Sequence, residues 1–502
     1  MFEAVNLWLE EAIFGHRLWA RQTPWLLLLE FLNVADAYNA DGRLLERRSP
    51  EQPMRYRLRW RMGLRNILFN SGSLVSIASA GFDDETAWNR WSTSMQRADA
   101  APEEGFGYLR KRFDSFEDFA EVVMLLRQSA LEAGGNRRWS SRFIFPFGVD
   151  AIYNDAIVKN DTPSRDYNNF GRTGELLHMM LSRSVHADEI RPHLQRFLDP
   201  ERPKNRLVAL LSAPSDVAVT STMSGDSLLP YRSHPAFDRL AVDWLSVLRL
   251  ELPEQDVLAY LAPLATLHVM LYLLETAAAV AGKPRPSLVC EIIAPRRELV
   301  RQRSIASFQD NDALGRRAVA ATLDRFFDSD EWTDIRDADL PAAERCEQAL
   351  DLLAREFSFK PKKHDAEEPE GLEILLRRTA EIKHDENWCD VHSAYGRYVG
   401  LVSRRATNRH RYAPTDALLK LLVITRVRKR CEFGRFLADL HQHYGFVFGP
   451  VEAATLPAAS YDEATFIRNR ERLEGRLSSM GLLKRLSDGC AYVLNTFDHS
   501  RT

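Results

Sequence analysis

A helical segment near the C-terminus runs directly into a β-hairpin signal, and this order constrains the fold more than any other feature of the sequence. Residues 461–480 repeat apolar side chains at helical spacing, and Gly481 then ends the pattern. The dipeptide Asp488-Gly489 separates the two strand-like runs that follow. Asp-Gly between such runs is a strong signal for a two-residue hairpin turn. The sequence therefore predicts a helix followed at once by a hairpin.

Two shorter helical patterns precede this segment. Residues 415–427 repeat leucine at helical spacing, and residues 432–444 do so with phenylalanine and leucine. A short strand is expected at 446–448, and Ser460 is expected to cap the third helix through a capping box. Three helices, a short strand and a hairpin in this order predict a winged helix over residues 412–497.

A basic row on the third helix indicates contact with DNA. Arg468, Arg472 and Arg476 are each four residues apart, so they lie along one side of the helix. Such a row can neutralise phosphates or donate two hydrogen bonds to guanine in the major groove. The alternative is a solvated face in which Glu471 and Glu474 pair with arginine. The full set of expected DNA contacts adds flanking residues of the helix and the wing: Arg468, Asn469, Arg472, Arg476, Ser479, Lys484 and Arg485.

Charge is distributed unevenly along the chain. The 502 residues carry 67 Lys and Arg against 70 Asp and Glu, a net charge of −3. Residues 401–502 alone contain 17 Lys and Arg against 10 Asp and Glu. A basic C-terminal region on an acidic body favours a polyanionic partner, although a chance surface bias has the same appearance.

The rest of the chain is mostly of helical periodicity, with strand signals only at 142–147 and 287–294. We therefore expect a mainly α, multidomain fold: a helical body with minor β content and a C-terminal winged helix. Proline and opposed charges at 359–371 predict an exposed linker. The expected domains are a helical N-terminal domain (1–135), a mixed α/β segment with ordered loops (136–235), a helical domain (236–358), the linker (359–371), connecting helices (372–411) and the winged helix (412–497).

Neither a metal site nor a cofactor site is expected. The five cysteines are far apart and never spaced C-x-x-C, which disfavours zinc binding and disulfides and fits a reducing cytoplasm. His441 and His443 are two residues apart and diverge on a helix, so they should not share a metal ion. No phosphate-binding glycine loop or nucleophile elbow is present. Glu381 and Lys383 have the E-x-K form of some nucleases, but in a helical run.

One segment has the length and apolar character of a membrane span. Residues 261–281 are almost entirely apolar. They also contain Pro263, His268 and Glu275, and the last two are costly in lipid. A buried core helix is therefore the favoured interpretation. Acidic residues near the N-terminus disfavour a secretory signal, so we expect a cytoplasmic protein.

Two further stretches carry unusual patterns. Residues 54–62 alternate arginine with aromatic and apolar side chains, which suits single-stranded nucleic acid or phosphates, or else ion pairs with the acidic body. Residues 142–184 predict an ordered loop region that leads into a helix. A structural or partner-docking role is favoured there over an active-site loop.

Three phrases of the sequence resemble an uncharacterised bacterial family encoded in phage-defence gene clusters of the methylation-associated type. They are WSSRFIFPFGVDAIYND at 139–155, FGRTGELLHMMLSRS at 170–184 and RNRERLEGRLSSMGLLKRLSDGCAYVLN at 468–495. The resemblance implies a component of a multi-subunit antiviral complex, with no catalytic residue to carry over. We therefore expect a non-enzymatic DNA-binding or assembly subunit, with double-stranded DNA and other defence proteins as partners. The alternatives are a divergent metal-dependent nuclease and a pure protein–protein scaffold.

Overall fold

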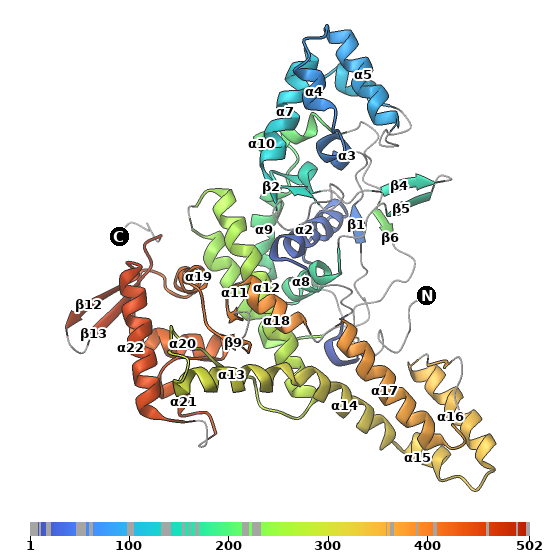
Figure 1. Cartoon of the computed structure of the whole chain (residues 1–502), viewed down its shortest axis with the longest axis vertical. Coiled ribbons are helices and arrows are strands. Elements are labelled where there is room, and N and C mark those ends of the chain that lie inside the picture. The colour runs from blue at the N-terminus through green and yellow to red at the C-terminus, as the bar shows by residue number, and fades with distance from the viewer. Residues whose placement is uncertain are drawn as a thin grey trace. The chain divides into compact units, whose positions relative to one another are not determined.

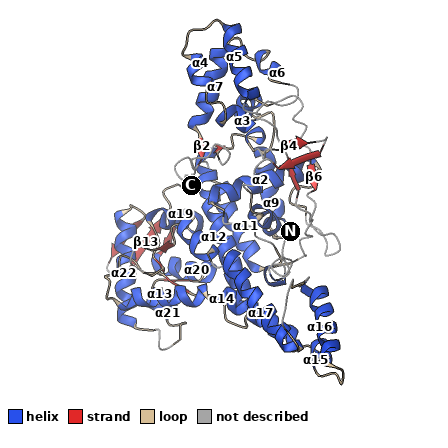
Figure 2. Cartoon of the chain, turned by 45° about the vertical axis from the view of Figure 1, so that its right-hand side comes forward, coloured by secondary structure: helices blue, strands red, loops and turns tan. Residues whose placement is uncertain are grey.

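Helices dominate the computed structural model of this chain, and strands are short (Figure 2). The expectation of a mainly α fold with minor β content is confirmed. The residues that the structure describes are 9, 12–16, 22–46, 57–59, 64–97, 105–131, 142–152, 156–159, 162–165, 170–212, 220–222, 232–250, 252–357, 359–361, 366–387, 390–404, 409–457, 461–487 and 490–497.

The chain divides into two compact units. One, here called the N-terminal unit, comprises Trp25–Tyr231. The other, the C-terminal unit, combines Met1–Pro24 with Arg232–Thr502. The first residues of the chain therefore belong with its second half. Arg232 contributes to this arrangement by donating hydrogen bonds to the carbonyl oxygens of Ala12 and Ile13.

The N-terminal unit is built from short helices and paired strands. Its aromatic core includes Trp88 and Trp91, which pack against Phe116 and Phe119. Its helices are α2 (Pro24–Ala40), α3 (Leu64–Phe69), α4 (Leu74–Ala78), α5 (Asp84–Arg97), α6 (Gly107–Arg110), α7 (Phe116–Gln128), η2 (Val149–Ala151), α8 (Thr173–Ser182), α9 (Ala187–Phe197) and α10 (Pro203–Ala209). The paired strands are β1 (Arg57–Arg59) with β6 (Thr220–Thr222), β2 (Ala130–Leu131) with β3 (Phe143–Ile144), and β4 (Ala156–Lys159) with β5 (Thr162–Arg165).

The loop that leads into α8 has a structural role. Glu30 of α2 is buried, and its carboxylate accepts hydrogen bonds from the backbone N–H groups of Arg172 and Gly174, both at 2.9 Å. A side chain at Gly174 would overlap the backbone of Phe31, so glycine lets the two helices approach closely. Every residue of α8 is buried. This part of the 142–184 region therefore forms core.

The C-terminal unit is organised around the apolar helix α12 (Glu254–Val280). The helices α11 (Pro235–Leu248), α14 (Leu314–Phe327) and α18 (Val391–Tyr398) pack against it. Among the described residues, α12 is the one helix long and apolar enough to cross a membrane, and 78% of its most apolar window is buried inside the protein. That burial is compatible with the core helix of a soluble protein.

The segment predicted as a domain linker joins two helices that pack together. Phe359 is 5% exposed, and Pro369–Gly371 already form the start of α17 (Pro369–Asn387). Helix α17 packs against α16 (Ala342–Phe357). Helix α17 also packs against α14, and α16 packs against α15 (Asp330–Arg336). Most described residues of 359–371 are exposed or half-buried, but a buried phenylalanine and the start of a helix also fall inside this segment, and whether it separates two domains stays a prediction. Residues 362–365 lie outside the described residues.

The three helices, the short strand and the hairpin expected near the C-terminus occur in the expected order, with β10 and α21 in addition (Figure 1). They are α19 (Asp416–Arg426), β10 (Arg430–Glu432), α20 (Phe433–Tyr444), β11 (Phe446–Val447), α21 (Pro450–Ala453), α22 (Glu463–Ser479), β12 (Leu483–Ser487) and β13 (Cys490–Leu494). Strands β10, β13 and β12 form an antiparallel sheet in that spatial order. Asp462 caps α22 by accepting from the N–H of Thr465, so the expected cap at Ser460 is corrected.

These elements share their core with the preceding chain. Strand β11 pairs in parallel with β7 (Leu288–Val289), and β9 (Arg411–Tyr412) pairs with β8 (Val402–Ser403). Val300 of α13 (Leu299–Asp312) packs in one apolar cluster with Phe466 of α22. The module at 412–497 is therefore built into the C-terminal unit.

Candidate nucleic-acid interface

The arginine row of α22 faces acidic residues of its own unit. Arg472 lies 2.7 Å from Glu298, and Arg468 lies 3.4 Å from the same carboxylate. Arg476 donates to Asp416 at 2.6 Å. Burial raises the pKa of Glu298, but the hydrogen bonds and charges of Arg472 and Arg468 outweigh it and lower that pKa. The row therefore anchors α22 to α13 and α19.

Two other expected DNA contacts are also engaged within the fold. Asn469 is fully buried, and its amide donates to the carbonyl oxygens of Cys290 and Phe448, each at 2.9 Å. Its side-chain oxygen accepts from the N–H of Ile292 at 2.9 Å. Asn469 therefore holds the core together and does not reach a groove of DNA. Ser479 donates to a backbone carbonyl one turn earlier in its own helix.

The solvent-facing side of α22 carries little positive charge. Two of its exposed residues are carboxylates, Glu463 and Glu471, and one is a cation, Arg468. Ile467 adds an apolar side chain that is 40% exposed. This composition is unfavourable for insertion between the phosphates of a major groove.

The outer face of the three-stranded sheet has the opposite character. In β12 and β13, Leu483 and Val493 are buried, whereas Lys484 is exposed and Tyr492 is half-buried. Lys484 lies directly opposite Tyr492 in the ladder, so both side chains point to one face. The guanidinium of Arg430 stands 5.7 Å from the Tyr492 ring centroid on the neighbouring strand. The basic sheet face is defined here as Arg430, Lys484 and Tyr492, which lie on this face, together with Arg428 and Lys429, two exposed cations of the loop that precedes β10.

Acidic partners are missing from the basic sheet face. Among the described residues, none of its four cations has a carboxylate within ion-pair distance. Arg485 points to the other side of the sheet and lies 3.2 Å from Glu474 of α22. Glu432 caps α20 by accepting from the backbone N–H groups of Gly434 and Arg435 at 2.8 Å. Glu432 lies opposite Tyr492 in the ladder, but its carboxylate is engaged by α20, and the four exposed cations outnumber it.

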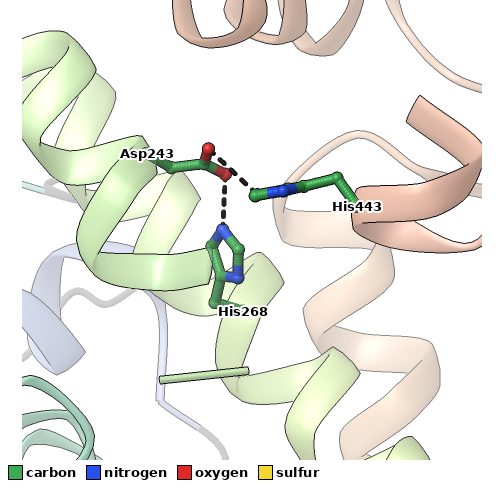
Figure 3. A group of neighbouring side chains, drawn as sticks. All are labelled: Asp243, His268 and His443. Atoms are coloured by element: carbon green, nitrogen blue, oxygen red, sulfur yellow. Dashed lines mark hydrogen bonds and ion pairs between the residues drawn. The ribbon is translucent and has the colours of Figure 1, made fainter. Parts of the chain in front are cut away.

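A second cluster of ionisable side chains lies buried in the C-terminal unit (Figure 3). Asp243 of α11 is its centre. His268 Nε2 lies 2.7 Å from Asp243 Oδ2, and His443 Nε2 lies 3.0 Å from Oδ1. Tyr444 donates its hydroxyl to Oδ2 at 2.5 Å, and Arg426 donates to Oδ1 at 2.9 Å. Four helices, α11, α12, α19 and α20, thus meet at one carboxylate.

The charged groups of this cluster stabilise one another. Burial by itself would raise the pKa of Asp243, but its interactions with His443 and His268 outweigh that effect and lower the pKa well below the ordinary range. Burial lowers the pKa of His268, although Asp243 opposes that shift. Burial would also lower the pKa of Arg426, and the partners Asp439 and Asp243 raise it. The carboxylate is therefore held ionised beside a permanent cation.

The same three residues have donor atoms within 4.8 Å of one another, which is close enough to hold a metal ion. Two observations favour the ion-pair network instead. Both oxygens of Asp243 already accept hydrogen bonds, and Arg426 places a positive charge 2.9 Å from the carboxylate, which disfavours a second cation beside it. The sequence does not reveal this cluster, because its members lie on three different helices and local periodicity does not show which helices pack together. His441 lies apart from it and lines a groove, as the divergence of His441 and His443 predicted.

The remaining sequence candidates are not brought together into a site. Glu381 and Lys383 both lie on the helix α17, as their helical surroundings predicted. Only 57–59 of the arginine-rich segment falls within the described residues, as strand β1. Cys290 and Cys346 are buried, Cys431 is half-buried and Cys490 is exposed, and these four are free thiols. Cys389 lies outside the described residues.

Comparison of the chain with protein families, with curated proteins and with solved structures finds no match.

Proposed function

We propose that the C-terminal unit binds double-stranded DNA through the basic sheet face, within an arrangement of the winged-helix type. The observation that carries this proposal is that two exposed cations on one side of the sheet, Arg430 and Lys484, and two in the loop before β10, Arg428 and Lys429, form no ion pair among the described residues. In this proposal the sheet contacts the nucleic acid, and α22 serves as the support on which the hairpin is built.

Contacts of this kind are made with phosphates and not with base edges. Lysine and arginine on a sheet face neutralise backbone charge, which supplies affinity without sequence readout. Tyr492 holds Arg430 by a cation–π contact and limits its freedom in the unbound state. We therefore propose binding that is sensitive to salt and tolerant of sequence. In this proposal the subunit positions an antiviral assembly on DNA, and the family resemblance supports it only in implying a component of such an assembly.

The experiment compares two triple variants of the full-length protein. The sheet variant carries Lys429→Ala, Arg430→Ala and Lys484→Ala. The control, here called the arm variant, removes three exposed cations from other surfaces of the same unit: Arg325→Ala, Lys360→Ala and Arg378→Ala. Fluorescence anisotropy with a labelled 20-base-pair duplex should show at least tenfold weaker binding by the sheet variant and less than twofold by the arm variant. Equal affinities of the wild type and the sheet variant would reject the proposal.

A protein partner is the second candidate, because large apolar side chains are exposed near the same module. Val451 of α21 is 73% exposed, and Leu486 of β12 is 60% exposed. Exposed apolar residues of this size are typical of protein contact surfaces when they gather in one patch. Substitution of Val451 and Leu486 by serine should leave duplex affinity unchanged, so the two candidates are distinguished by different variants.

A further inference from the structure

An open groove of about 840 Å³ lies in the C-terminal unit, away from the residues of the basic sheet face. One wall is formed by α13 and the start of α14, and the other by the loop 283–287 with the C-terminal end of α20. Both views of the ribbon place α13 beside α20 and α21 (Figure 1, Figure 2). The volume is within the range of about 300–1,000 Å³ that is usual for small-molecule sites.

The charged residues that line this groove are mostly cations. Lys283, Arg285, Arg303 and Arg317 are cations, and Asp310 is the one carboxylate among the lining residues. Arg303 stands in the first half of α13 and Arg317 in the first turn of α14, so positive charge extends along the groove. Lys283 and Arg317 are exposed and have no acidic partner among the described residues.

Hydrogen bonds within the protein fix the residues that line the groove. Arg285 pairs with Glu275 and donates to the backbone carbonyl oxygens of Gln442 and His443, which fixes the end of α20 against the loop. Ser307 accepts from the N–H of Val289 and donates to the carbonyl oxygen of Ser287. A preformed site avoids part of the ordering cost of binding.

Apolar side chains complete the lining. Val289 and Leu314 are buried and Leu456 is half-buried, with Pro286 and Pro457 beside them along the groove. A ligand that fits this lining carries both negative charge and an apolar part. No phenylalanine, tyrosine or tryptophan is among the lining residues, whereas surfaces that bind single strands stack successive bases on such rings. The volume of the groove, which is that of a small-molecule site, and the lack of such stacking rings favour a free ligand over a strand.

We propose that this groove is a binding site for a free nucleotide, whose phosphates contact Arg317, Lys283 and Arg303 and whose base packs against the apolar lining. The site shares no residue with the basic sheet face, so it goes beyond the DNA-binding proposal and stands or fails separately from it.

The test is isothermal titration of the full-length protein with each of the four common ribonucleoside triphosphates. Saturable binding of at least one of them, near one per chain, is expected. Arg317→Glu and Lys283→Glu should each weaken that binding at least tenfold, because each reverses a charge that faces the phosphates. Arg325→Glu is the matched control: it makes the same charge change at an exposed position on α14 that does not line the groove, and it should change affinity less than twofold.

Three results would overturn the proposal. One is the lack of saturable binding by every triphosphate at millimolar concentration. Another is equal binding of inorganic tripolyphosphate and all four nucleotides, which would remove the contact with the base. A third is binding of an oligothymidylate strand, weakened by Arg317→Glu, when no free nucleotide binds. Circular dichroism of each variant checks that the fold is retained, as expected for exposed positions.

Discussion

At the scale of single residues, the structure shows ionisable side chains kept in one charge state by their surroundings. Asp243 stays ionised in the core because burial raises its pKa less than its interactions with His443 and His268 lower it. His178 of α8 is fully buried, stacks on Tyr38 at 4.7 Å, and has no hydrogen-bond partner for either ring nitrogen among the described residues. The charge state of each of these two side chains affects the stability of the fold, and one substitution tests each.

Asp243→Asn should lower the free energy of unfolding by about 3–5 kcal/mol, because removing one member of a buried charge network leaves the others without compensation. The matched control is Asp439→Asn, whose side chain is 37% exposed and which should cost about 0–1 kcal/mol. Urea unfolding followed by circular dichroism measures both. Equal stability of Asp243→Asn and the wild type would show that the network does not hold the four helices together.

The lowered pKa of the buried His178 predicts that the protein loses stability in acid. Burial lowers its pKa from 6.5 to about 3 in the folded protein. Between these values the unfolded chain binds the proton and the folded chain does not, so the free energy of unfolding falls as the pH drops below about 6.5. His178→Phe keeps an aromatic ring against Tyr38 without a titrating group, and should lose less stability between pH 7 and pH 4.5. Identical pH profiles would contradict this explanation.

At the scale of elements, helical periodicity predicted where the helices lie. It did not predict which residues surround them. The expected helices 415–427 and 432–444 match α19 and α20 within about a residue at each end, and the hairpin appears as β12 and β13. Periodicity also placed Arg468, Arg472 and Arg476 on one side of α22. It could not show that Glu298 and Asp416 would face that side, because neither residue is a neighbour of α22 in sequence.

The charges of α22 should therefore affect stability more than DNA affinity. Arg472→Ala removes a partly buried pair with Glu298, and we expect a loss of about 1–2 kcal/mol, between the values for exposed and buried pairs. Duplex affinity, measured well below the melting temperature, should change less than twofold. A large loss of duplex affinity with unchanged stability would indicate that α22 contacts the DNA.

At the scale of the whole molecule, the sequence predicted the fold class but not how distant segments combine. Residues 1–24 join a unit that begins again at Arg232, and β7 pairs with β11 across more than a hundred intervening residues. The Asp243 cluster depends on the same long-range packing. Local signals such as caps, turns and periodicity contain no information about these pairings.

The buried cluster also predicts how the protein responds to metal removal. Because Arg426 already supplies the positive charge beside Asp243, treatment with a chelator should leave the melting temperature unchanged. Differential scanning calorimetry before and after dialysis against EDTA measures this. One equivalent of a transition metal in the purified protein, lost together with stability on dialysis, would mean that the cluster is a metal site.

The salt dependence of duplex binding tests the central proposal most directly. Each phosphate neutralised contributes about −0.9 to the slope of log K against log salt concentration. Anisotropy titrations between 50 and 300 mM salt should show that Lys429→Ala, Arg430→Ala and Lys484→Ala together flatten the slope by about two to three. Alanine substitution of Arg468, Arg472 and Arg476 should change it by less than one. If the sheet variant keeps the wild-type slope while the helix variant flattens it, the basic sheet face does not bind the DNA and α22 does.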